Sequence, residues 1–147
     1  MRGHRIITIV IFFMFAVYSY SSHKGVCTCL RDTVVEYSLE GISSEGTSVM
    51  VKYVDREISS AIITAYGCSG QVQIEYLFDK QKKMIRVREK RYNYQKPITE
   101  VESAEDMILA HDMHYCINLE GEIIERNPDI EPTDIFIPFT EAVPFSI

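Results

Sequence analysis

Hydrophobic and polar residues alternate along several short stretches of the chain, which is the pattern of β-strands with one buried face. The clearest run is Gln71–Phe78, in which Val, Ile, Tyr and Phe occupy every second position. Similar alternation over Thr33–Leu39 and Ser48–Val54 predicts two further strands. The segment 40–47 between them contains two glycines and two serines and is expected to form a turn.

Further strands are expected on both sides of the clearest run. Ile62–Tyr66 is typical of a short buried strand, and Met84–Tyr94 is expected to pair with Gln71–Phe78 as a β-hairpin with a basic tip. Tyr115–Leu119 and Glu122–Ile124 can pair across the Glu-Gly dipeptide that separates them.

The hydrophobic period changes between residues 97 and 116. Ser103 followed by Asp106 resembles a helix capping box, and the apolar residues Met107 and Ile108 begin a helical stripe. We therefore expect one short helix in this segment. Five or six short strands with one helix, and no β-α-β alternation, favour a small β-barrel or sandwich.

The amino terminus has the pattern of a secretory signal peptide. Two arginines precede the apolar run Ile6–Val17, and small polar residues follow at Ser19–Ser22. We expect a signal peptide over residues 1–22 and a single secreted domain over residues 23–147, whose four prolines after residue 127 give it an irregular carboxy-terminal tail. No later apolar segment is long enough to suggest a membrane span.

The chain has four cysteines, and an even number in an exported protein predicts two disulfides. Cys27 and Cys29 are poor partners for each other, because a one-residue spacer closes a strained ring. Each is therefore expected to bond to Cys68 or Cys116. Their spacing does not match a zinc site, and no metal or cofactor of the protein's own is expected.

The net charge of −6 argues against nucleic acid as the partner. Eight of the 15 basic residues nevertheless lie between Lys80 and Lys96. The candidate residues for binding a polyanion are Lys80, Lys82, Lys83, Arg86, Arg88, Lys90 and Arg91. On a strand, alternate residues of this set project to one side, which suits a sulfated polysaccharide or an acidic protein surface. A solvated hairpin whose lysines prevent edge-to-edge pairing is the alternative.

No pattern indicates catalysis. The chain lacks a G-x-S-x-G nucleophile motif, and its cysteines are better explained as disulfides. His111 and His114 are spaced at i and i+3, but no third zinc ligand is evident and the H-E-x-x-H spacing is absent. We expect a binding protein that is not an enzyme.

The motif Cys27-Thr28-Cys29 is followed by a D-T-V-V strand that leads to Gly41. This order resembles the start of netrin-like modules, especially the tissue inhibitors of metalloproteinases. Residues 46–54 resemble the second strand of that family, and Cys68-Ser69-Gly70 with residues 75–78 resembles its mid-domain segment. The resemblance covers residues 27–78, and Cys116 is a plausible further match.

The resemblance implies a five-stranded OB-like barrel with disulfides from Cys27 to Cys68 and from Cys29 to Cys116. It also implies that Cys27 and Thr28 bind a zinc metalloproteinase. In these inhibitors the amine and carbonyl of the first cysteine chelate the protease zinc, and the next side chain enters the specificity pocket.

Three functions remain open from the sequence. The first is a secreted netrin-like binding protein, acting as a metalloproteinase inhibitor. The second is a lipocalin-like carrier of a small hydrophobic ligand, and the third is an extracellular interaction module that uses the basic hairpin. A carrier requires a hollow interior with an open mouth, whereas an OB-like barrel is filled by its own side chains.

Overall fold

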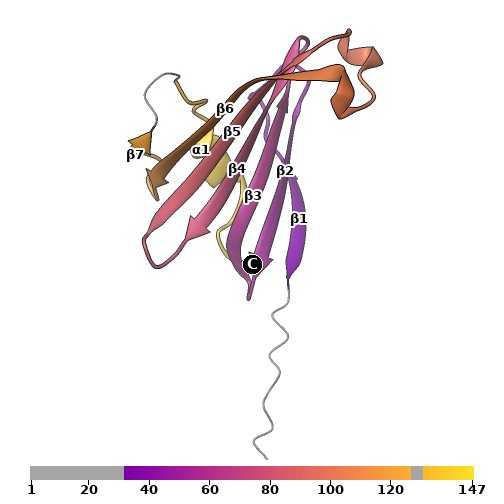
Figure 1. The fold of residues 1–147 in the computed structure, drawn as a ribbon. Coiled ribbons are helices and arrows are strands. Elements are labelled where there is room, and N and C mark those ends of the chain that lie inside the picture. Colours follow the sequence, from indigo (N-terminus) through magenta and orange to yellow (C-terminus); the bar gives the residue numbers. More distant parts are fainter. Residues whose placement is uncertain (1–31, 127–130) are drawn as a thin grey trace, which may run out of the picture.

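Seven strands form one antiparallel sheet in the computed structural model, which describes residues 32–126 and 131–147 (Figure 1). The strands are β1 (Thr33–Ser38), β2 (Thr47–Val54), β3 (Glu57–Tyr66), β4 (Gly70–Asp79), β5 (Met84–Tyr94), β6 (Met107–Asn118) and β7 (Ile123–Arg126). Their order in the sheet is their order in the chain. The hairpin predicted around residues 79–83 is confirmed by the pairing of β4 with β5 from Gly70–Asn93 to Asp79–Met84.

The mainly β class with one short α-helix is confirmed, but the sheet is not a five-stranded barrel. Within the described residues β1 and β7 do not pair with each other, so the sheet stays open. Strands that each lie beside their chain neighbours form an up-and-down meander, whereas an OB barrel has Greek-key connections. The topology is therefore closer to that of up-and-down β proteins.

The hydrophobic core covers one face of the sheet. Val49, Val51 and Tyr53 alternate with more exposed residues along β2 and are completely buried. The helix α1 (Phe136–Ala142) packs on this inner face, where Phe139 is completely buried and its ring centroid lies 5.2 Å from that of Tyr76. The inner face is thus filled by the protein's own aromatic side chains.

The prediction of a helix between residues 97 and 116 is wrong. Two single 3-10 turns, η1 (Ile98–Glu100) and η2 (Ala104–Asp106), precede β6. The Asp106 carboxylate accepts hydrogen bonds from the backbone N–H groups of Glu102 and Ser103 at 3.1 and 3.3 Å, as in a capping box. The 3-10 turn η2 does not continue as an α-helix, because the following residues hydrogen-bond to the edge of β5 instead. They form β6, which pairs with β5 from Tyr94–Met107 to Met84–Asn118.

The carboxy-terminal segment crosses the inner face and is attached near both of its ends. Near residue 133, the completely buried carboxylate of Glu89 accepts hydrogen bonds from Thr133 and from Arg91 Nε. At the other end, the Ile58 N–H donates to the carbonyl of Phe145 at 2.8 Å. These two sets of contacts hold both ends of residues 133–145 against the sheet, and α1 lies between the two attachment points.

Candidate functional site

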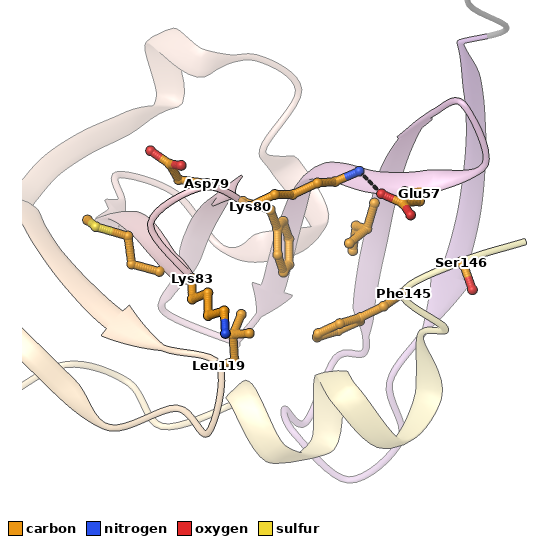
Figure 2. Close-up of a pocket in the computed structure, with 10 residues that line it drawn as sticks. Glu57, Asp79, Lys80, Lys83, Leu119, Phe145 and Ser146 are labelled. Carbon is orange, nitrogen blue, oxygen red and sulfur yellow. Dashed lines mark hydrogen bonds and ion pairs between the residues drawn. The ribbon is translucent and has the colours of Figure 1, made fainter.

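A cavity of about 430 Å³ opens at the end of the sheet where the β4–β5 hairpin turns (Figure 2). Its volume is in the range of small-molecule sites, about 300–1,000 Å³. The lining residues come from the β2–β3 and β4–β5 hairpins, the β6–β7 turn and the carboxy-terminal tail. They are Glu57, Ile58, Phe78, Asp79, Lys80, Lys83, Met84, Leu119, Phe145 and Ser146.

The carboxy-terminal tail supplies one wall of the cavity. The backbone hydrogen bond from Ile58 to Phe145 and a bridge between Glu57 and Ser146 hold the tail beside the start of β3. This backbone position directs the Phe145 ring toward the cavity, where it contacts the Phe78 ring edge to face at a centroid distance of 5.4 Å. The ring is nevertheless 37% exposed, so its apolar surface remains accessible at the mouth.

The β4–β5 turn supplies the opposite wall. Asp79 ends β4, and its side chain accepts a hydrogen bond from the Lys82 N–H at 3.1 Å, which closes the turn. Lys83 then takes a left-handed backbone conformation with φ of 50°, an arrangement uncommon for residues other than glycine. Lys83 and Leu119, which is 42% exposed, both line the cavity.

The charges around the mouth are not all neutralised. Lys80 forms an ion pair with Glu57 across the opening (Figure 2). The Asp79 carboxylate is turned away from Leu119 and Phe145 in the same view. Lys83 has no ion-pair partner among the residues that the structure describes. The cavity therefore combines apolar walls with two ionisable side chains that form no ion pair within the described residues, the Lys83 ammonium and the Asp79 carboxylate.

Basic residues of β5 occupy two different faces. Arg86, Arg88 and Lys90 project to the outer face, on the same side as expected. Arg91 lies on the inner side, where its guanidinium donates to Glu89 at 2.8 Å and to the Glu131 carbonyl at 2.7 Å. Arg91 is therefore not part of the outer stripe.

Ion pairs also neutralise part of the predicted polyanion site. Arg88 donates to both carboxylate oxygens of Asp112, at 3.0 and 2.7 Å, and this contact lowers the pKa of Asp112. Lys80 is paired with Glu57, as described above. In residues 32–126 and 131–147, the members of the set without an ion pair are Lys82, Lys83, Arg86 and Lys90.

The predicted protease-binding residues Cys27 and Thr28 lie outside the described residues, as does Cys29. Cys68 lies in the β3–β4 turn and Cys116 in β6, and the two are not bonded to each other. Cys116 pairs with Arg86 of β5, and Arg86 pairs with Leu77 near the end of β4. Cys68, in contrast, precedes the start of β4. About 20 Å of strand separates the two levels. Both predicted disulfides therefore remain predictions.

A second cavity, of about 330 Å³, lies beside Glu89 and is lined by Tyr76, Tyr115, Glu131 and Asp134 among others. Burial raises the pKa of Tyr76, and burial together with Glu89 raises the pKa of Tyr115. Both phenols therefore stay protonated near neutral pH, and the Glu89 carboxylate is occupied by its hydrogen bonds. Neither phenol is therefore an activated base or nucleophile in this cavity.

Sequence reasoning did not identify the cavity as a site. Of its lining residues, Lys80 and Lys83 belong to the predicted polyanion set, whereas Ile58, Leu119 and Phe145 carried no functional pattern. The three are far apart in the chain and meet only because hairpin ends and the tail converge. No local periodicity could have linked them.

Comparisons with family models, curated proteins and solved structures found no match to this chain. In the part of the chain that the structure describes, no group of three or more His, Cys, Asp or Glu side chains is arranged to hold a metal ion. The same residues contain no helix with the length and hydrophobicity needed to span a membrane. Any functional assignment thus depends on the geometry of the cavity itself.

Proposed function

We propose that this chain is a secreted binding protein for a small hydrophobic molecule, which occupies the cavity at the end of the sheet. The observation that carries the proposal is the partly exposed pair of Phe145 and Leu119 at the mouth of a cavity of about 430 Å³. Leaving such apolar surface in water costs about 25 cal/mol per Å², and a bound apolar group removes that cost. The site differs from a lipocalin interior, because α1 fills the inner face.

Binding of the neutral apolar fluorophore N-phenyl-1-naphthylamine tests the proposal. The protein is expected to enhance its fluorescence in a saturable manner. Leu119→Trp, which fills the cavity, and Phe145→Ala, which removes a wall, should both weaken binding. Ile137→Ala is the matched control, since Ile137 is 58% exposed on α1 and does not line the cavity. Absence of binding, or equal binding by all three variants, would contradict the proposal.

The metalloproteinase-inhibitor hypothesis is retained as a second proposal. It is favoured by the separation of Cys68 from Cys116, which leaves both available to the C-x-C motif. A chelating inhibitor needs a free α-amine on Cys27, because an additional residue turns that amine into an amide. Protein made to begin at Cys27 should therefore inhibit zinc metalloproteinases more strongly than protein that begins near Ser22. Equal lack of inhibition by both forms would contradict this hypothesis.

A further inference from the structure

We infer that the ligand is a single-chain amphiphile with an anionic head group, whose alkyl tail enters the cavity and whose head contacts the Lys83 ammonium. This inference rests on the proposed function and names the chemical class of its ligand. It follows from how apolar surface and charge are distributed around the mouth.

The tail is selected by the inner walls. Ile58 is buried and Phe78 is half-buried, and the Phe78 ring contacts both Phe145 and the core residue Phe139. The polar and charged lining residues come from the hairpin turns and the carboxy-terminal tail, and they are Glu57, Asp79, Lys80, Lys83 and Ser146. A flexible hydrocarbon tail suits the inner walls, because an apolar tail needs no hydrogen-bond partner inside the cavity.

The head is selected by the residual charge at the mouth. Glu57 and Lys80 neutralise each other, so neither offers a full charge to a ligand. Asp79 also has no ion-pair partner in the described residues, but its carboxylate accepts a hydrogen bond from the Lys82 N–H and is directed away from Leu119 and Phe145 (Figure 2). Lys83 is left as the one lining ammonium without an ion-pair partner in the described residues, which favours an anionic head over a neutral or cationic one.

The position of Lys83 is set by the turn. Its left-handed φ of 50° and the Asp79–Lys82 hydrogen bond fix where its side chain leaves the backbone. Lys83 from the β4–β5 turn and the apolar residue Leu119 from the β6–β7 turn line the same cavity. An ammonium at a boundary between hydrocarbon and water matches the geometry of a carboxylate on an alkyl chain.

Competition with the bound fluorophore tests the inference, using dodecanoate and 1-dodecanol as monomers at neutral pH. Both should displace the fluorophore, because both have the same tail, and dodecanoate should bind about fivefold more tightly. Lys83→Gln should abolish that preference, because it should weaken dodecanoate binding more than dodecanol binding. Lys82→Gln is the matched control, since it removes a neighbouring hairpin lysine that does not line the cavity, and it should preserve the preference.

The outcomes separate the two proposals. If dodecanol and dodecanoate bind equally well to the unaltered protein, or if Lys83→Gln keeps the preference for dodecanoate, the inferred head-group selection is wrong and the hydrophobic site stands. If neither compound nor the fluorophore binds, the proposed function itself fails. Tighter binding of dodecylammonium than of dodecanoate would overturn the inference directly.

Discussion

Thr133 makes two hydrogen bonds to one carboxylate: its backbone N–H donates to Glu89 Oε2 at 2.9 Å, and its hydroxyl donates to Glu89 Oε1 at 2.7 Å. Arg91 donates to the same carboxylate at 2.8 Å. A completely buried carboxylate is stable only when such donors compensate the loss of water. The hydrogen bonds between Thr133 and Glu89 therefore attach the segment that leads into α1 to strand β5 of the sheet.

Removing the Thr133 hydroxyl should destabilise the fold. Thr133→Val keeps the size of the side chain but leaves Glu89 Oε1 with one donor fewer, and we expect a loss of about 1–3 kcal/mol in the free energy of unfolding. Urea unfolding followed by circular dichroism measures this change. Thr33→Val, at an exposed position of β1, is the matched control and should change stability by less than about 0.5 kcal/mol. Equal effects of the two substitutions would show that the Glu89 contact contributes little.

The ion pair between Arg88 and Asp112 predicts a loss of stability in acid. The hydrogen bond from Arg88 lowers the pKa of Asp112 below its ordinary value of 3.8. The unfolded chain therefore takes up a proton at higher pH than the folded chain, and this contribution is present above about pH 4 and disappears as the pH falls below it. Asp112→Asn should be less stable than the unaltered protein at neutral pH. Unfolding curves should show that this difference narrows below pH 4, and a difference independent of pH would contradict the assignment.

The buried tyrosines predict a loss of stability in alkali. Burial raises the pKa of Tyr76 above its ordinary value of 10.0, so the folded state keeps the phenol protonated when the unfolded chain has lost its proton. The stability contribution is complete below about pH 10 and decreases as the pH rises above it. Tyr76→Phe should show a smaller decrease in melting temperature between pH 9 and pH 11 than the unaltered protein does. A decrease of the same size in both proteins would contradict this prediction.

Binding to a sulfated polysaccharide should depend on the basic residues that form no ion pair within the described part of the chain. The double variant Lys82→Ala/Arg86→Ala is expected to elute from a heparin column at lower salt, because local positive charge governs such contacts. Arg88→Ala/Asp112→Ala is the matched control, since it removes an oppositely charged pair and leaves the net charge unchanged. Unchanged elution of the first variant would support the alternative of a solvated hairpin.

Chain length restricts the disulfide that Cys68 can form. Thr33 lies at the same end of the sheet as the start of β3, whereas Cys68 follows the far end of this ten-residue strand, about 30 Å away. Cys29 precedes Thr33 by four residues, which span at most about 14 Å. Cys27 precedes it by six residues, which span about 22 Å. A disulfide adds up to about 7 Å between Cα atoms, so Cys29 reaches at most about 21 Å and Cys27 at most about 29 Å. Cys29 therefore falls well short of Cys68, whereas a fully extended Cys27 segment falls only slightly short of it.

Peptide mapping without reduction should therefore find no Cys29–Cys68 peptide, and a peptide that joins Cys68 to the C-x-C motif should contain Cys27 as the bonded residue. This is the pairing that the netrin-like resemblance implies, with Cys29 bonded to Cys116. A peptide joining Cys29 to Cys68 would contradict the strand order of the sheet. A peptide joining Cys68 to Cys116 would contradict both the sheet and the resemblance.

The sequence by itself determined the strands whose two faces differ in environment. The alternation in Gln71–Phe78 predicted β4, and the expected hairpin partner Met84–Tyr94 predicted β5; more buried and more exposed residues alternate along much of both strands. The glycines at 41 and 46 have positive φ, as a turn between β1 and β2 requires. These features are local, so neighbouring residues suffice to encode them.

Only the tertiary structure decided the strand β6 and the cavity. Residues 107–114 have a pattern compatible with a helix, but the long edge of β5 satisfies their backbone hydrogen bonds in an extended conformation. Leu119 and Phe145 form one mouth because a turn and a tail converge at the same end of the sheet. Such contacts depend on how the sheet packs against the carboxy-terminal segment, and no sequence period records that packing.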